Sequence, residues 1–292
     1  PTTKTQTKNH LELFLKTTRN QTQKNITNFK TRNMKLLYKK YNLLGLLLVL
    51  ICSSSFAQIT PLTVEEWVVT HSLQDSTDHV PTAIDLNGNL YITGYAYSSS
   101  TGQDIVTVKI DPNGNVLWSQ TYNGTGNSFD KAVGLLADTL GNVYVAGTSV
   151  GTSLTNDFVL LKYDSSGVQQ FVSYYDNGTN ESAVGVGVDS LGNIYIGGTS
   201  ADMSSGNDFA VVKYNTVGVQ QWVYRYDHNL GNDNAIAFRT SQTGITYLTG
   251  NSFDATTQND IATVAINTLG TQLWSNRYNN AFNGNEQAQD LK

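Results

Sequence analysis

Cysteine, proline and charged residues are all scarce in this chain. Its 292 residues contain one Cys and four Pro, and 14% are charged, against 39% that are hydrophobic. One cysteine excludes a fold held together by disulfides, and this hydrophobic fraction excludes disordered and collagen-like chains. Gly (25 residues) and Tyr (16 residues) are plentiful, together with Thr, Ser and Asn, which is typical of short strands joined by tight turns. The composition therefore predicts an all-β fold.

Basic residues are unevenly distributed along the chain. Ten of the 18 Lys and Arg residues precede Gln58, where Glu12 is the only acid, so this segment carries a net charge of +9. From Gln58 onward, 8 basic and 22 acidic residues give a net charge of −14. Nucleic acid is therefore excluded as a partner of this second part, because phosphate contact needs clustered Lys and Arg.

Residues 34–57 have the pattern of a signal peptide. Met34 is the first methionine, basic residues follow it, an apolar run covers residues 43–51, and small residues stand at the predicted cleavage site after Ala57. A bilayer needs about 20 apolar residues, so this run predicts no transmembrane segment after cleavage. Residues 1–33 are rich in Thr, Asn, Gln and Lys, and we interpret them as disordered or as translated upstream of the true start.

A repeated unit occupies the rest of the chain. Aligning the chain with itself gives four copies, with spacings of 53, 51 and 52 residues between Gly88, Gly141, Gly192 and Gly244. Four further sets of anchors keep this register: Asp104, Asp157, Asp208 and Asp260; Gly114, Gly167, Gly218 and Gly270; Trp118, Phe171, Trp222 and Trp274; and Tyr122, Tyr175, Tyr226 and Tyr278. A period of this size is typical of propellers, solenoids and other arrays.

Each repeat has the pattern of four strands. In the second copy, apolar or β-rich segments cover residues 132–137, 142–149, 158–163 and 169–175. The turns within each pair of strands have Asp, Asn or Ser at the first position and Gly at the fourth, as in a type I turn followed by a left-handed residue. Because the strands are apolar on both faces, each sheet is expected to pack between two others. The prediction is a β-propeller of four-stranded antiparallel blades.

The pattern D-x-x-G-N-x-Y-[IV]-x-G begins at Asp85, Asp138 and Asp189, and N-D-F-x-x-x-K-Y covers Asn156–Tyr163 and Asn207–Tyr214. These motifs resemble the bacterial SBBP (seven-bladed β-propeller) repeat family over about residues 65–292. The resemblance implies a propeller but says little about function. In the fourth copy, Ser241, Ile245 and Ala265 depart from the pattern.

Four complete blades are predicted within residues 58–292. Their expected boundaries are 78–125, 126–176, 177–228 and 229–280, with a partial blade at 281–292. Trp67–His71 matches a fourth strand, so the mature chain is expected to open with an outer strand. Seven such blades would extend to about residue 430. We therefore expect a chain truncated at its C-terminus and an open, incomplete ring.

An acidic residue opens each inner strand, and these acids are the leading candidates for a functional site. The repeat would place them on one rim of the central channel, where several carboxylates could hold a ligand or a cation. Alternatively, each acid accepts hydrogen bonds from neighbouring turn amides. The set consists of Asp78, Asp130, Glu181, Asp233 and Glu286.

No cofactor is predicted, and calcium is kept as an alternative for the turns. Asp85, Asn87 and Asn89 offer hard oxygen ligands, but their glycine stands at the fourth place and Ala96 at the twelfth, where a calcium loop has Gly at the sixth and Glu at the twelfth. Turn chemistry explains these residues better. The histidines His71, His79 and His228 show no metal-ligand spacing.

The sequence shows no catalytic constellation. Gly147-Thr-Ser-Val-Gly151 matches the nucleophile pattern of hydrolases, but that motif needs a helix after its strand, and here another strand follows. The recurring aromatic residues, such as Trp118, are expected to pack between blades. A platform for sugars would more naturally use the non-repeating Tyr95, Tyr97 or Tyr224.

The sequence favours an exported protein, extracellular or on the outer cell surface, that binds a protein or a glycan through its loop face or channel mouth without catalysing a reaction. The alternative is a glycoside hydrolase or polysaccharide lyase that uses the rim carboxylates. A third hypothesis is a stalk for a further C-terminal domain.

Overall fold

Sixteen strands and no helix make up residues 80–292, the part of the chain that the computed structural model describes. The predictions for the signal peptide, for the outer strand at Trp67–His71 and for Asp78 lie outside the described residues. Within residues 80–292, no helix has the length and hydrophobicity to cross a membrane.

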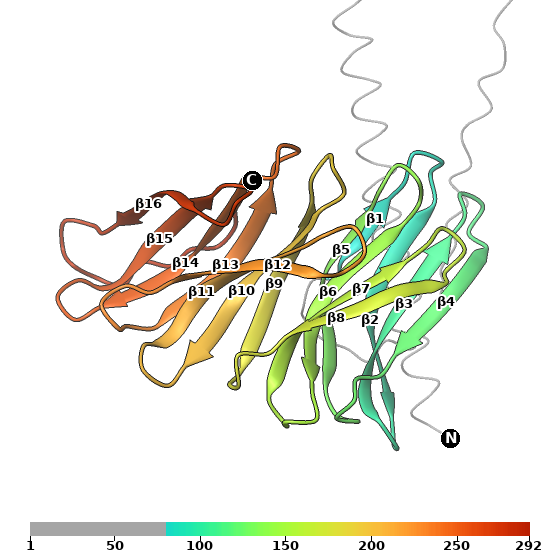
Figure 1. The fold of residues 1–292 in the computed structure, drawn as a ribbon, viewed down its shortest axis with the longest axis horizontal. Coiled ribbons are helices and arrows are strands. Elements are labelled where there is room, and N and C mark those ends of the chain that lie inside the picture. Colours follow the sequence, from blue (N-terminus) through green and yellow to red (C-terminus); the bar gives the residue numbers. More distant parts are fainter. Residues whose placement is uncertain (1–79) are drawn as a thin grey trace, which may run out of the picture. The chain divides into compact units, whose positions relative to one another are not determined.

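The strands form four separate sheets of four consecutive strands each (Figure 1). The first sheet contains β1 (Thr82–Ile84), β2 (Leu90–Ser98), β3 (Gly102–Ile110) and β4 (Val116–Tyr122). The second contains β5 (Asp130–Ala137), β6 (Val143–Val150), β7 (Asn156–Tyr163) and β8 (Gln169–Tyr175). The third contains β9 (Glu181–Val188), β10 (Ile194–Asp202), β11 (Gly206–Tyr214) and β12 (Gln220–Tyr226). The fourth contains β13 (Asp233–Thr240), β14 (Thr246–Asp254), β15 (Gln258–Ile266) and β16 (Gln272–Tyr278).

Each sheet is an antiparallel meander, as the repeat predicts. β5 pairs with β6, β6 with β7, and β7 with β8, and the other sheets repeat this order. The turn glycines make the reversals: Gly141 has a φ of 80° and donates its N–H to the carbonyl of Asp138 at 3.0 Å. Glycine is favoured there because residues with a side chain rarely adopt a positive φ.

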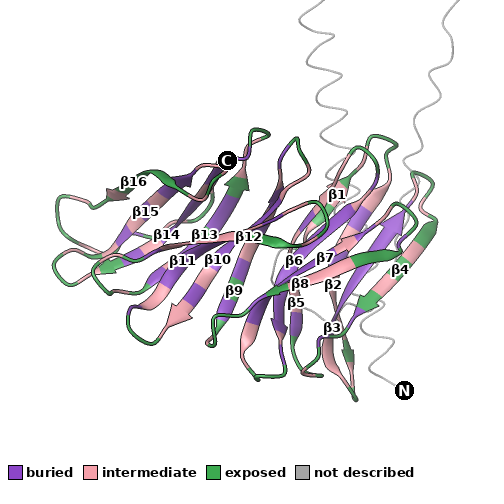
Figure 2. Cartoon of the chain, in the orientation of Figure 1, coloured by how far each residue is buried: buried purple, intermediate pink, exposed green. Residues whose placement is uncertain are grey.

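The hydrophobic core lies between consecutive sheets. Phe158 of β7, for example, is fully buried in one cluster with Ala183 of β9 and Ile196 of β10. Figure 2 shows the buried residues concentrated on the inner and middle strands of the sheets, whereas the exposed residues lie mainly in the turns and on the outermost strands. Each sheet is therefore a propeller blade that depends on its neighbours for its core, which confirms the predicted fold class.

The innermost strands β1, β5, β9 and β13 lie next to one another from blade to blade. The blades fan out from them as an open arc, with β1–β4 at one end and β13–β16 at the other (Figure 1). The predicted open ring is thus seen in the described residues.

The last blade shows what a following blade contributes. Tyr122, Tyr175 and Tyr226 end the fourth strands of the first three blades and are at most 9% exposed, whereas Tyr278 at the same place in the fourth blade is 61% exposed. Exposed apolar surface of this kind is covered in the first three blades by the blade that follows.

Candidate binding sites on the two faces of the blades

The two ends of each blade present different structures. One end carries the turns that join the first strand to the second and the third to the fourth, such as Asp138–Gly141 and Asp164–Gly167, and we call it the turn face. The other end carries the β2–β3-type hairpins and the connections between blades, such as residues 176–180, and we call it the crossover face.

On the turn face, the repeated aspartates organise the turns. Oδ1 of Asp138 accepts the N–H groups of Leu140 and Asn142, both at 2.9 Å, and Oδ2 accepts the Asn142 amide at 2.8 Å and the Tyr144 hydroxyl at 3.0 Å. Asp85 and Asp189 make the same set of hydrogen bonds. Both oxygens are therefore occupied, and the D-x-x-G-N-x-Y motif is explained by turn geometry.

Neighbouring blades are also fastened together at the turn face. The carbonyl of Ser165 accepts hydrogen bonds from Lys109 Nζ at 3.1 Å and from Trp118 Nε1 at 3.2 Å, both from the preceding blade. The Lys109 ammonium also lies over the Tyr91 ring, 5.2 Å from its centroid. The recurring Trp and Lys residues are thus parts of a contact between blades, as the sequence predicts for the aromatic positions.

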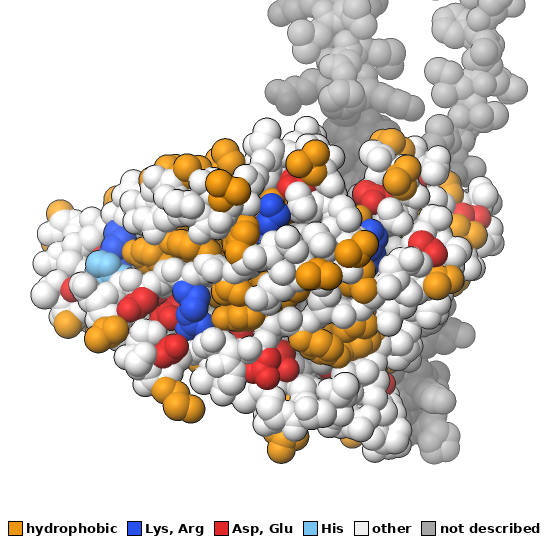
Figure 3. Space-filling view, viewed as in Figure 1, with side chains coloured by type: hydrophobic (Ala, Val, Ile, Leu, Met, Phe, Trp, Pro, Cys, Tyr) orange, Lys and Arg blue, Asp and Glu red, His pale blue; other side chains and the backbone are white. Residues whose placement is uncertain are grey.

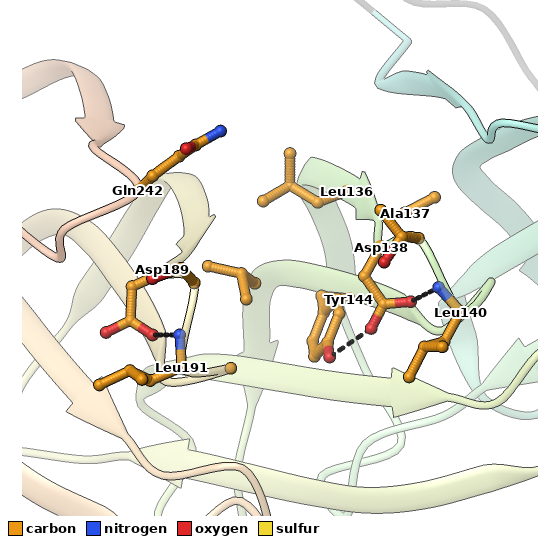
Figure 4. A pocket seen from close by; sticks show the side chains of 12 residues that line it. Leu136, Ala137, Asp138, Leu140, Tyr144, Asp189, Leu191 and Gln242 are labelled. Atoms are coloured by element: carbon orange, nitrogen blue, oxygen red, sulfur yellow. Dashed lines mark hydrogen bonds between the residues drawn. The ribbon is translucent and has the colours of Figure 1, made fainter.

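A hollow of about 660 Å³ opens on the turn face between the first turns of the second and third blades (Figure 4). Leu140 and Leu191 flank it and are 79% and 78% exposed, while Gln242 of the fourth blade reaches its border. Asp138 and Asp189 hold the two turns in place. The hollow therefore combines exposed apolar side chains with a fixed backbone.

The central cavity has a different lining. It measures about 570 Å³ and is bordered by the inner strands of all four blades, including Val133–Leu136, Val184–Val188 and Phe238–Thr240. Among the described residues, Arg239 is the one charged residue of its lining, and Asp130, Glu181, Asp233 and Glu286 do not belong to it. A ligand in this cavity would meet mainly aliphatic side chains and backbone.

The described rim acids lie buried at the crossover face, where each contacts a loop between blades. Asp130 accepts the Gly124 N–H at 2.7 Å and the Ser149 hydroxyl at 2.5 Å. The other three also accept hydrogen bonds from these loops: Glu181 from the Asn177 N–H at 3.4 Å, Asp233 from the His228 N–H at 2.7 Å, and Glu286 from the Asn280 amide. Glu181 accepts a further bond from the Ser200 hydroxyl at 3.0 Å. These four acids are at most 8% exposed. Their contacts are those of loop anchors, the alternative considered for them above.

Burial changes the proton affinity of these acids. It raises the pKa of Glu181 to about 7 and that of Asp233 to about 6, because the charged form loses its hydration. Burial also raises the pKa of Asp157 on strand β7 to about 6. This residue was predicted as a repeat anchor and not as a site residue. Asp157 recurs with Asp104, Asp208 and Asp260, and Glu181 recurs with Asp130 and Asp233, so no signal in the repeat links the two sets.

Two minor candidates have local structural explanations. Ser149, inside the hydrolase-like Gly147–Gly151 motif, donates to Asp130, its partner in the last residue pair of strands β5 and β6. His228 Nε2 lies 3.2 Å from Asp254 Oδ2, at the end of β14. The side chain of Asn229, the next residue on the His228 loop, contacts both of these side chains.

No family model matches the chain, and no curated protein is significantly similar to it in sequence. Among solved structures, a subtype N11 neuraminidase-like protein (flat-faced bat, Peru) is 11% identical with a TM-score of 0.43, over 68% of this chain and 53% of its own. A protein of unknown function from Dyadobacter fermentans is 12% identical with a TM-score of 0.41, over 66% of this chain and 62% of its own. An α-L-arabinofuranosidase from Clostridium thermocellum is 14% identical with a TM-score of 0.38, over 68% and 72%. The aligned part thus spans less than two thirds of the first two proteins, and the propeller assignment rests on the sheets described above.

Proposed function

We propose that this protein is an exported, SBBP-type propeller that acts as a non-enzymatic binding scaffold for a protein or glycan, with the turn face as its binding surface. The observation that carries the proposal is the pair Leu140 and Leu191, large apolar side chains held exposed beside the 660 Å³ hollow. Exposed apolar groups on rigid turns are typical of interaction sites.

The surface around the hollow fits this role. Hydrophobic side chains reach the surface in several places on the side of the molecule seen in Figure 3, among scattered acidic and basic groups, and Leu136, Leu140 and Leu191 line the hollow itself. Asp138 and Asp189 accept hydrogen bonds from the N–H groups of their own turns. A partner would therefore be recognised mainly by apolar contact, which suits a hydrophobic peptide segment or the apolar face of a sugar ring.

The binding role can be tested with a hydrophobic-peptide array and a glycan array probed with the purified chain. For any probe that binds, Leu140→Ser with Leu191→Ser should weaken affinity at least about tenfold, because each loses a buried apolar contact of about 1.5–3 kcal/mol. Leu269→Ser is the matched control, since Leu269 is 79% exposed on a turn outside the hollow and should leave affinity unchanged. If the double variant bound the probe as tightly as the Leu269→Ser control, the proposal of a binding site on the turn face would be wrong.

A glycoside hydrolase or polysaccharide lyase is the second candidate, and the observation that favours it is Glu181, whose pKa is raised to about 7 in the manner of a general acid. Glu181 is 1% exposed, so a substrate would have to displace the loop at residues 176–180. Turnover of a polysaccharide panel that Glu181→Gln abolishes, with folding intact, would establish the enzyme and overturn the scaffold.

Export is tested separately. Expression of the chain in a bacterial host, followed by N-terminal sequencing of the protein from outside the cytoplasm, should give a mature protein that begins at Gln58. Retention of residues 34–57 in the cytoplasmic fraction would contradict it.

A further inference from the structure

Carboxylates from neighbouring blades converge at two places on the crossover face. In each cluster, one oxygen from each of three acids lies within 4.8 Å of the others. The β7–β9 cluster consists of Asp157, Asp176 and Glu181; the β11–β13 cluster consists of Asp208, Asp227 and Asp233. In both, the first acid lies on the third strand of one blade, the second on the loop between blades, and the third on the inner strand of the next blade.

The β11–β13 cluster contains buried carboxylate oxygens that have no partner. Asp208 and Asp233 are 3% and 0% exposed. Oδ2 of Asp208 accepts Arg225 Nη2 at 2.6 Å, and Oδ2 of Asp233 accepts the His228 N–H, whereas Oδ1 of both residues is buried without a hydrogen bond. A buried charged oxygen left without a donor is costly, so these oxygens call for a positive ligand.

In the β7–β9 cluster, the negative charge has less compensation. Asp157 is 4% exposed, and Oδ1 accepts one long hydrogen bond, from Thr155 at 3.2 Å. Arg225 of the third blade binds Asp208, but Tyr174 stands at the corresponding position of the second blade. Asp176 lies close enough to disfavour ionisation of both Asp157 and Glu181.

Comparison with the other junctions shows that the loop acid is not needed for the architecture. Asn123 and Asn279 stand where Asp176 and Asp227 stand in these clusters. There the asparagine side chain closes its own loop, with Asn123 Nδ2 donating to Asn127 Oδ1 at 2.7 Å and Asn279 Nδ2 to Asn283 Oδ1 at 2.8 Å. Asp176 and Asp227 also close their own loops, with Oδ1 of Asp176 accepting the Gly178 N–H at 2.6 Å and Oδ1 of Asp227 accepting the Leu230 N–H at 3.0 Å. Because asparagine closes the corresponding loops at the other two junctions, loop closure does not require a carboxylate there.

We propose that the β7–β9 and β11–β13 clusters each bind one divalent cation of the hard, oxygen-preferring class to which Ca²⁺ belongs. Carboxylate oxygens are the ligands that this class prefers, and loop carbonyls and water complete its coordination. Because the ligands come from two consecutive blades, a bound cation would cross-link them. These sites are on the opposite face from the turn-face hollow, so they are independent of the proposed binding role.

The test uses the full chain, stripped of metal and held at pH 7.5. Isothermal titration calorimetry measures how many equivalents of Ca²⁺ bind, and thermal unfolding measures how far they stabilise the protein. The wild type should bind two equivalents of Ca²⁺, Asp227→Asn one, and Asp176→Asn with Asp227→Asn none. At a Ca²⁺ concentration about 100-fold above Kd, the unfolding temperature of the wild type should rise by about 10–20 °C, and that of the double variant should not move.

The variants carry the asparagine already present at the sibling junctions, so they should fold. Asp290→Asn removes an exposed acid outside both clusters and should keep both equivalents. Asn123→Asp recreates the third acid beside Asp104 and Asp130 and should add a third equivalent. No Ca²⁺ uptake by the wild type, or undiminished uptake by the double variant, would overturn the proposal.

Discussion

The indole ring of Trp118 lies so close to Gly167 of the following blade that a Cβ atom on the glycine would come within 2.8 Å of it. Phe171 and Gly218 repeat the contact one blade later, as do Trp222 and Gly270 after that. The glycine at the fourth turn position thus serves both the turn, with a φ of 87° at Gly167, and the packing between blades.

The contact predicts that Gly167→Ala destabilises the protein by more than its backbone strain. Gly178 is the matched control, because its φ is 79° and no atom lies within 4 Å of the position of its Cβ. Gly178→Ala should cost about 1 kcal/mol, the price of a left-handed alanine, and Gly167→Ala about 1–3 kcal/mol more from overpacking. Urea unfolding of both variants measures the difference, and equal values would show that the Trp118 contact contributes nothing.

Arg225 is expected to be essential for the third blade. It binds Asp208 at 2.6 Å, and Asp208 is almost completely buried. Arg225→Met should cost about 3 kcal/mol, because it leaves a buried charge without its partner, and adding Asp208→Asn should recover part of that loss. Arg239→Met, which breaks an exposed pair with Asp290, should cost less than about 1 kcal/mol. Similar losses for the two arginine variants in chemical denaturation would contradict the assignment.

The turn aspartates predict a reciprocal pair of substitutions. Asp138→Ala removes the acceptor of the Leu140 and Asn142 amides and of the Tyr144 hydroxyl, and should destabilise the protein by about 1–3 kcal/mol. In the degenerate fourth blade, Ser241→Asp should raise the free energy of unfolding by up to about 1 kcal/mol, because the carboxylate supplies the second acceptor oxygen that Ser241 lacks. Thermal unfolding tests both changes, and a destabilising Ser241→Asp would show that the fourth turn has its own geometry.

Stability should fall as pH rises through the weakly acidic range in metal-free buffer. The pKa of Glu181 is about 7 in the folded chain, above the usual value of about 4.3 for an exposed Glu, because the residue is buried. Between these values the folded state holds a proton that the unfolded state has lost, so the free energy of unfolding decreases with pH. Asp157 and Asp233, with pKa values of about 6, act in the same direction.

Glu181→Gln should make this pH dependence shallower between pH 4.5 and 7.5, because the amide does not titrate. Urea unfolding at half-unit pH intervals provides the measurement. An unchanged slope in the variant would mean that Glu181 is ionised throughout this range.

The blade architecture could be predicted from the sequence because its determinants are local and repeated. The spacing from Gly141 to Gly192 and the Asp138–Gly141 turn specify a strand pair without reference to the rest of the chain. The turn-face contacts were partly visible as well, since Trp118, Gly167 and Lys109 keep the same period.

The candidate sites were less accessible because they depend on distances between blades. The connection at residues 176–180 brings Asp157 and Glu181 together, and the path of this loop cannot be predicted from the sequence of either strand. The rim acids were expected on one rim of the channel, and the sequence could not show that Asp130 and Glu181 are buried there beneath the loops between blades. The repeat indicates which residues are equivalent, but only the structure shows which of them meet.

The contacts of Lys109 and Trp118 with Ser165 run from one blade to the next in chain order. Lys213 and Trp222 of the third blade bind the Thr268 carbonyl of the fourth in the same way. The array is therefore directional. Each blade accepts hydrogen bonds from the preceding blade, and the following blade covers its outer apolar surface. Amide hydrogens should therefore exchange fastest in β16, where Trp274 is 46% exposed, and protection should grow toward the middle of the array. We expect unfolding to begin in the fourth blade and to proceed from there toward the middle of the array.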